Sequence, residues 1–325
     1  MNQIDIVRIR NQYSQNSAVD TRKFDRRALL KASGALGLAG AVFVGGGSFF
    51  SGARAQDEEG GGMPPLPEGA TVVGQGLWNP GNLTLGADGT LYIAEQGIAG
   101  GGMDGPSVAT PGPDGSPIPA APPLVAPQIS AVAPDGTVYV ADAGGNTIYQ
   151  IDPASGEFSL FAVVPNLTDL TGSTPTPEEE AMQPGPRQPV PTSVAIAPDG
   201  TITVVLLSEM WNGPSILDYQ ADGTYAVRET EPLSMIVNAT YGPDGLLYVS
   251  QLTADFSGEM PAPGAVYRVE ADGVVTPVVE GLFFPHGIAF APASGNLFVV
   301  TNSIISGPDA PLGMVVRIDD VATVA

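Results

Sequence analysis

The stretch from Ile129 to Asp142 reads Ile-Ser-Ala-Val-Ala-Pro-Asp-Gly-Thr-Val-Tyr-Val-Ala-Asp. It consists of one apolar run, a Pro-Asp-Gly turn and a second apolar run. Proline presets φ at the first turn position, the aspartate side chain caps the turn, and glycine supplies the positive φ that reverses the chain. The stretch therefore predicts two short antiparallel strands joined by a tight turn.

This phrase recurs along the chain in five degenerate copies. They span residues 83–95, 129–142, 194–206, 239–251 and 288–301. Successive turns are 47, 64, 45 and 50 residues apart. A period of this size fits one four-stranded sheet per step, with an insertion in the second step. We therefore expect an all-β fold, a single β-propeller of the NHL type with five four-stranded blades.

The two ends of the repeat region predict how such a ring closes. Thr71–Gly74 has no partner in its own repeat, and Met314–Ile318 is a third strand without a fourth. Because a ring of sheets must cover its first and last edges, we expect these segments to share the last blade. Residues 97–127 and 166–189 lack strand alternation and are expected to be long loops. Six blades remain the alternative if 97–127 contains a degenerate sheet.

The first 55 residues have the pattern of a twin-arginine signal rather than of a folded element. Arg26 and Arg27 precede an apolar Gly/Ala-rich run over 32–50, and Ala-Arg-Ala ends at Ala55. We expect export to the periplasm or the cell exterior, cleavage after Ala55, a flexible linker over 56–69 and the propeller over 70–325. A membrane anchor is the alternative interpretation of this segment.

Removal of the leader would change the charge of the chain sharply. The whole chain has 12 basic and 34 acidic residues, of which the first 55 hold eight and three, so that the remainder has a formal charge of −27. Such a surface repels nucleic acid and anionic lipid, and it suits either cation binding or simple solubility outside the cell. The chain has no cysteine, which excludes disulfides and thiol chemistry. We expect a monomer with no membrane span after cleavage.

Four further phrases resemble the ScyD/ScyE family of exported propeller proteins. They are Gly-Leu-Trp-Asn-Pro at 76–80, Val-Ala-Asp-Ala-Gly-Gly-Asn at 140–146, Val-Pro-Thr-Ser-Val-Ala-Ile-Ala-Pro-Asp-Gly at 190–200, and Gly-Ala-Val-Tyr-Arg-Val at 264–269. The resemblance covers most of residues 70–318. It implies an exported NHL-like propeller, usually with six blades, and no defined catalytic set. Where the family has room for another blade, this chain has only residues 97–127.

Oxygen-bearing side chains near the ends of the second strands form a candidate cation site. Glu95 and Asp142 end the second runs of two repeats, and Asn302 follows the second run of another. If these residues meet near the axis, they could bind Ca²⁺ or another hard cation, which takes six to eight oxygen ligands. The alternative is that Glu95 and Asp142 cap strands through bonds to backbone amides.

His286 is the single histidine of the chain and lies in Phe-Phe-Pro-His-Gly, just before a repeat strand. It is a candidate general base or single metal ligand, or else a structural residue. Two functions follow. The first is a binding or scaffold protein for a small molecule, an ion or an extracytoplasmic partner. The alternative is a metal-dependent hydrolase of the gluconolactonase-like propeller type, in which the cation activates water or a lactone.

Overall fold

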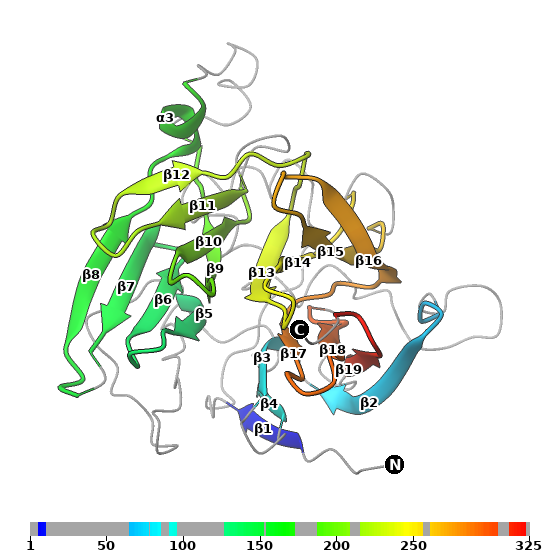
Figure 1. Ribbon diagram of the computed structural model, residues 1–325. Coiled ribbons are helices and arrows are strands. Elements are labelled where there is room, and N and C mark those ends of the chain that lie inside the picture. Colours follow the sequence, from blue (N-terminus) through cyan, green and yellow to red (C-terminus); the bar gives the residue numbers. More distant parts are fainter. Residues whose placement is uncertain are drawn as a thin grey trace, which may run out of the picture.

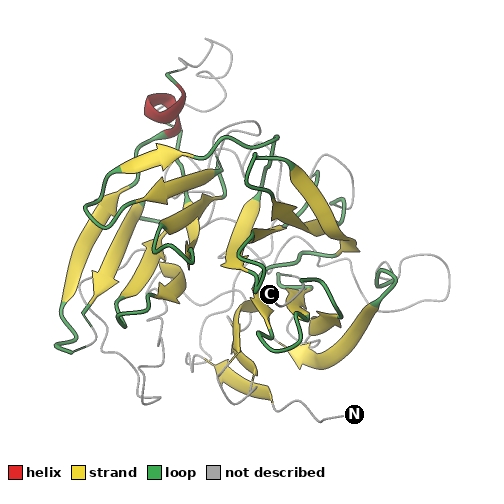
Figure 2. Cartoon of the chain, in the orientation of Figure 1, coloured by secondary structure: helices red, strands yellow, loops and turns green. Residues whose placement is uncertain are grey.

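The structure, a computed structural model, consists almost entirely of β-strands in the residues that it describes (Figure 2). The described ranges are 6–10, 65–77, 79–85, 91–95, 127–152, 154–172, 187–208, 215–255, 261–304 and 312–322. The strands form four sheets of four strands and one sheet of three. This confirms the predicted all-β propeller architecture.

Each four-stranded sheet is an antiparallel meander with the strand nearest the axis first. One holds β5 (Pro127–Val132), β6 (Val138–Asp142), β7 (Thr147–Ile151) and β8 (Phe158–Val163). The next holds β9 (Pro191–Ile196), β10 (Ile202–Leu206), β11 (Ile216–Tyr219) and β12 (Tyr225–Val227). The third holds β13 (Ile236–Tyr241), β14 (Leu247–Gln251), β15 (Gly264–Val269) and β16 (Val275–Leu282). The fourth holds β17 (Ile288–Phe290), β18 (Leu297–Thr301), β19 (Gly313–Ile318) and β2 (Ala70–Leu77).

The first repeat forms the three-stranded sheet, so the described chain has four complete blades and not the five expected. Its own strands are β3 (Pro80–Leu85) and β4 (Leu91–Glu95), and β1 (Ile6–Arg10) pairs in parallel with β4. Strands that would follow β4 within the repeat belong to residues 96–126, which lie outside the described ranges. β1 comes from the segment expected to be cleaved, and cleavage would remove it from this sheet.

The last blade is built from both ends of the repeat region, as the sequence predicts. β2 pairs antiparallel with β19 over its length, with Thr71 opposite Arg317 and Gly74 opposite Val315. This confirms the predicted sharing of the blade. Closure of the ring between the β1–β4–β3 sheet and the β5–β8 sheet is not shown by the described residues.

The sheets stand around a common axis, and β3, β5, β9, β13 and β17 are the strands nearest to it (Figure 1). We call these five the inner strands. β9 packs against β5 and β13, β13 against β17, and β17 against β3. All five run in the same direction along the axis because each begins its repeat. One end of the axis is therefore surrounded by the starts of the inner strands, and the other end by the turns that follow them.

The Pro-Asp-Gly turns form as their side-chain chemistry predicts. The Asp135 carboxylate accepts a hydrogen bond from the Thr137 N–H at 2.9 Å, and Asp199 accepts one from Thr201 at the same distance. These bonds favour the ionised form and lower the pKa of both aspartates. The glycine after each aspartate has a φ near +90° (89° and 90°). An Ala-Asp-Gly version joins the third and fourth strands of two blades, at 221–223 and 271–273.

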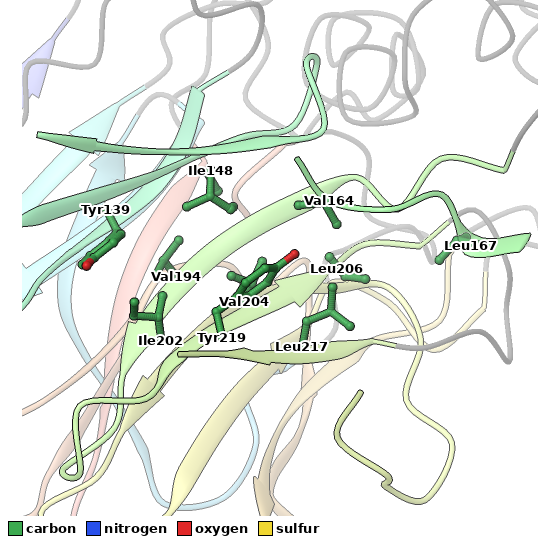
Figure 3. Close-up of a cluster of buried hydrophobic side chains, with 11 residues drawn as sticks. Tyr139, Ile148, Val164, Leu167, Val194, Ile202, Val204, Leu206, Leu217 and Tyr219 are labelled. Atoms are coloured by element: carbon green, nitrogen blue, oxygen red, sulfur yellow. The ribbon is translucent and has the colours of Figure 1, made fainter. Parts of the chain in front are cut away.

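Apolar side chains fill the space between neighbouring blades. Figure 3 shows the cluster between the β5–β8 and β9–β12 sheets, which brings together Tyr139, Ala141, Ile148, Val164, Leu167, Val194, Ile202, Val204, Leu206, Leu217 and Tyr219. All of these side chains are buried. Without disulfides, such interfaces supply most of the stability of the ring, at about 25 cal/mol for each Å² of apolar surface buried.

Leu167 reaches this cluster from a short helix that sequence reasoning did not predict. Helix α3 (Leu167–Thr171) lies at the start of the expected loop 166–189, so the first part of that prediction is wrong. The Asn166 side chain accepts a hydrogen bond from the Asp169 N–H and caps the helix start, and Gly172 ends the helix in the left-handed conformation. Within the described ranges, no helix has the length and apolar character needed to cross a bilayer.

Candidate functional site

Asp142 is buried at the end of β6, beside the turn that leads to β7. A Cβ atom placed on Gly145 would lie only 2.8 Å from Asp142 Oδ2 and 3.0 Å from the Thr147 hydroxyl. The carboxylate thus lies against the Gly144–Gly145 turn, with 1% of the residue exposed. This position explains why the sequence has two glycines there, since a side chain at Gly145 would displace the carboxylate.

Asn302 follows β18 and has a left-handed backbone with φ of 57°. Its side-chain nitrogen donates a hydrogen bond to the Leu312 carbonyl at 3.1 Å. Leu312 directly precedes β19, so this bond holds the start of the third strand against the end of the second. The residue is 2% exposed.

His286 is buried where the β17–β18–β19–β2 blade meets two neighbours. Its carbonyl accepts a hydrogen bond from Ser250 Oγ of β14 at 2.6 Å, and the N–H of the next residue, Gly287, donates to the Gly81 carbonyl of β3 at 2.9 Å. Burial lowers the pKa of the imidazole to about 4, and a hydrogen bond with the Gly81 backbone offsets only part of this effect. The ring is therefore neutral at pH 7 and is 1% exposed.

These three residues lie at the end of the axis where the inner strands begin, and an apolar cluster occupies that end. We call this cluster the apolar seal. Its buried members come from all four complete blades and are Ala143, Val190, Leu207, Met235, Val237, Leu252, Phe283, Phe284 and Ile304. The site expected at this end is thus crowded by hydrocarbon side chains.

Backbone strain recurs where the chain enters the inner strands. Val190, Met235 and Phe284 have φ of 52°, 55° and 48°, and Asn79 has 43° at the matching place before β3. Positive φ is costly for residues with large or β-branched side chains, by about 1–3 kcal/mol each. Three of the four belong to the apolar seal, so burial of their side chains offsets the strain.

Within the described residues, no group of three or more histidine, aspartate or glutamate side chains gathers as a metal centre would require. Glu95 ends β4, but its side chain lies outside the described part of the chain. The predicted cation site of Glu95, Asp142 and Asn302 is thus not assembled by what is described, and it stays a prediction, as does a catalytic role for His286.

A cavity of about 430 Å³ lies at the opposite end of the axis, beside the turns that follow the inner strands. All five inner strands contribute to its lining, through residues 82–85, 131–132, 194–196, 238–243, 288–290 and 292. Thr84, Val132 and Pro292 are exposed at its rim, with Val132 at 59%. The cavity therefore opens to solvent on the face that carries the turns.

Two amides in this cavity come from equivalent positions of two sheets. Asn82 and Asn238 each lie three residues after a left-handed residue, Asn79 and Met235 respectively. The Asn82 side-chain oxygen accepts a hydrogen bond from the Leu83 N–H at 2.7 Å. Asn238 is 1% exposed, and its side-chain nitrogen has no hydrogen-bond partner among the described residues. Buried amides without a partner are rare, and they are explained by water, by a ligand or by strain.

Tyr241 lines the cavity and connects it to a polar network between two blades. Its hydroxyl lies 2.8 Å from Thr203 Oγ1 and accepts a hydrogen bond from Arg228 at 2.9 Å. Arg228 also donates two hydrogen bonds to Asp218, at 2.7 and 2.8 Å. Burial disfavours the guanidinium charge, but the bonds to Asp218 and Tyr241 outweigh this and raise the pKa of Arg228. The network fixes the Tyr241 ring in the cavity wall.

The described residues that line the cavity include no charged side chain. The rest of the lining is aliphatic, apart from Phe290, Tyr241, Thr84, Thr240 and the two asparagines. Sequence reasoning missed this site because it looked for carboxylates at the ends of second strands. The available signal was the pair of asparagines that interrupt inner strands which are otherwise apolar.

Comparison with known proteins identifies the architecture and no activity. No family model and no curated protein matches the chain. Solved structures that are similar include a gluconolactonase from Xanthomonas campestris (15% identity over 54% of each chain, TM-score 0.40). A virginiamycin B lyase from Staphylococcus aureus is similar at 15% identity over 79% of this chain and 75% of its own (TM-score 0.39). The hydrazine synthase of Kuenenia stuttgartiensis is similar at 17% identity over 76% and 59% (TM-score 0.44).

The chain spans only about half the length of the gluconolactonase it matches. Since all three identities lie below 25% and all three TM-scores below 0.5, these similarities assign neither ligand nor reaction to this chain. The propeller architecture rests on the pairing and packing of its own strands.

Proposed function

We propose that this protein is a binding propeller that holds a small molecule in the axial cavity. The observation that carries the proposal is the cavity itself, about 430 Å³ in volume and lined by the inner strands of five sheets. This volume lies within the range of about 300–1,000 Å³ that is usual for small-molecule sites. Strands packed on both sides hold the lining rigidly, which lowers the entropy lost when a ligand binds.

The two ends of the axis differ in a way that supports one entrance. The apolar seal crowds the end where the inner strands begin, whereas the rim at the turn end has exposed Thr84 and Val132. A ligand would therefore enter and leave on the face that carries the Pro-Asp-Gly turns.

Export by the twin-arginine route and membership of the ScyD/ScyE family are part of the proposal. They rest on the paired Arg26 and Arg27, the Ala-Arg-Ala site that ends at Ala55, and the four phrases shared with that family. Under this proposal the propeller acts as a monomer outside the cytoplasm, in a process that involves a secreted small molecule. The strong negative charge of the chain without its leader agrees with a protein that must stay dispersed there.

The hydrolase alternative gains no specific support from the described residues. Asp142 lies against its own turn, the amide nitrogen of Asn302 binds the Leu312 carbonyl, and His286 is buried beside β3. Binding is thus the function that the described geometry favours.

A thermal-shift screen of the full chain against a small-molecule library tests the proposal. Val132→Trp places a large ring at the rim of the cavity, and Val163→Trp makes the same change on the outer strand β8, where valine is similarly exposed at 63%. Compounds that raise the melting temperature of the wild type should lose their effect in Val132→Trp and keep it in Val163→Trp. Equal shifts in both variants would place binding elsewhere and overturn the proposal.

A further inference from the structure

Asn238 is the group in the cavity that most clearly lacks a partner. It belongs to β13, which is covered by blades on both sides, and only 1% of the residue is exposed. Its side-chain nitrogen carries two N–H donors and meets no acceptor among the described residues. A buried donor of this kind favours any occupant of the cavity that presents an acceptor oxygen, because the bond replaces an unmet need rather than a bond to water.

The second asparagine of the cavity differs from Asn238 in its commitments. The Asn82 side-chain oxygen already accepts from the Leu83 N–H, so this amide is oriented by its own backbone. The hydroxyl of Tyr241 is engaged with Thr203 and Arg228. Asn238 is therefore the lining residue whose hydrogen bonding would change most when the cavity is filled.

The charge of the surroundings selects among ligands that carry an acceptor. The lining has no cationic side chain among its described residues to pair with an anion, and the chain has a formal charge of −22. Moving an anion into such a site would cost its hydration without a counter-charge in return. A cation would find no carboxylate in the lining and would offer no acceptor to Asn238.

The remaining surface of the cavity is hydrocarbon. Leu83, Val194, Ile288 and Phe290 lie in its lining beside the amides. Apolar walls with a few fixed polar groups suit a ligand that has an apolar body and one or two polar atoms.

We infer that the axial cavity recognises uncharged molecules with an apolar body and a carbonyl-type oxygen, and that the Asn238 side-chain nitrogen donates the hydrogen bond that selects them. The inference rests on the proposed function, since it names the ligand class of the same site. Asn238 acts as the specificity-determining residue, and the network of Tyr241, Thr203 and Arg228 keeps the opposite wall in place.

Three probes of one size test this inference, namely benzamide, benzoate and benzamidine. They share a phenyl ring and differ in the polar group, which is a neutral acceptor, an anion and a cation without an acceptor oxygen. Binding is measured by nuclear magnetic resonance on the full ¹⁵N-labelled chain, with the Asn238 side-chain amide as the reporter. Benzamide should shift this resonance, and the two charged probes should bind at least about fivefold more weakly at equal ionic strength.

Variants separate a hydrogen bond from simple occupancy. Asn238→Leu keeps the size of the side chain and removes the donor, and it should weaken benzamide at least about fivefold. Gln220→Leu removes an exposed amide outside the cavity and should bind benzamide as the wild type does. Val132→Trp blocks the rim without touching Asn238, so it tests the site even if Asn238→Leu fails to fold.

The outcomes distinguish the inference from the function on which it rests. If benzoate or benzamidine binds as tightly as benzamide and Val132→Trp abolishes binding, the cavity binds ligands and the neutral class is wrong. Benzamide affinity that is unchanged in a folded Asn238→Leu chain overturns the role of Asn238. If none of the three probes perturbs the residues of the cavity, both the inference and the proposed function fail.

Discussion

Acidification should destabilise this protein through His286, well above the pH at which its carboxylates titrate. The imidazole is buried and its pKa falls from 6.5 to about 4, because burial disfavours the charged ring. The unfolded chain therefore binds this proton at a higher pH than the folded chain does. The resulting stability is fully present above pH 6.5 and is lost as the pH falls through 6.5 toward 4.

The size of this effect follows from the shift of the pKa. A shift from 6.5 to about 4 corresponds to a loss of about 2 kcal/mol at pH 5 and about 3 kcal/mol at pH 4, at about 1.4 kcal/mol for each pKa unit. No discount for solvent applies, since the residue is 1% exposed. Protonation would also place a charge between β17 and β3, beside the bond from the Gly287 N–H to the Gly81 carbonyl.

Urea unfolding of the wild type and of His286→Gln, at several pH values from 7 to 4, measures the effect. The variant is less stable at pH 7 but lacks the titrating group, so the gap between the two chains should close by about 2–3 kcal/mol as the pH falls. General effects of the acidic surface cancel in this difference. Parallel loss of stability in both chains would refute the reasoning, because it would mean that His286 titrates alike in the folded and unfolded states.

Three other substitutions probe the joints between blades and the predicted cation site. Gly287→Ala should destabilise the fold by about 1–3 kcal/mol in urea unfolding, because the new Cβ would lie 2.7 Å from the Gly81 carbonyl oxygen; an unchanged midpoint would contradict the close packing of β17 on β3. Ser250→Ala removes a buried hydroxyl that bonds the carbonyl of the next blade, and a loss of about 1–2 kcal/mol is expected; a neutral result would show that this bond does not hold the blades together. If the predicted Ca²⁺ site exists, EDTA should lower the melting temperature of the wild type but not of Asp142→Asn; equal behaviour of the two chains would reject Asp142 as a ligand.

The turns and the shared blade were predictable because their causes are local. Asp135 and Asp199 cap their turns through the N–H two residues on, which is a property of the Pro-Asp-Gly phrase itself. The pairing of β2 with β19 follows from counting strands, since one end of the repeat region had a spare strand and the other lacked one. The count of complete blades was wrong because the first repeat supplies only β3 and β4 within the described chain.

The position of the functional site was harder to predict because it depends on side-chain direction at strained residues. Val190, Met235 and Phe284 look like ordinary apolar residues near the start of a strand, and nothing in their identity announces a positive φ. In the structure they contribute to the apolar seal and crowd the end where the oxygen ligands were expected to meet. The cavity is left at the other end, where Asn82 and Asn238 stand among apolar neighbours.

A crystal structure of the full chain grown with benzamide would examine the proposed site directly. We expect the benzamide ring in the axial cavity between the inner strands, with its oxygen within hydrogen-bond distance of the Asn238 side-chain nitrogen and with Phe283 and Phe284 packed at the opposite end. Benzamide bound at the Phe283–Phe284 end, or a cavity filled by the side chains of its own lining, would contradict the proposal that this protein binds its ligand on the axis at the turn end.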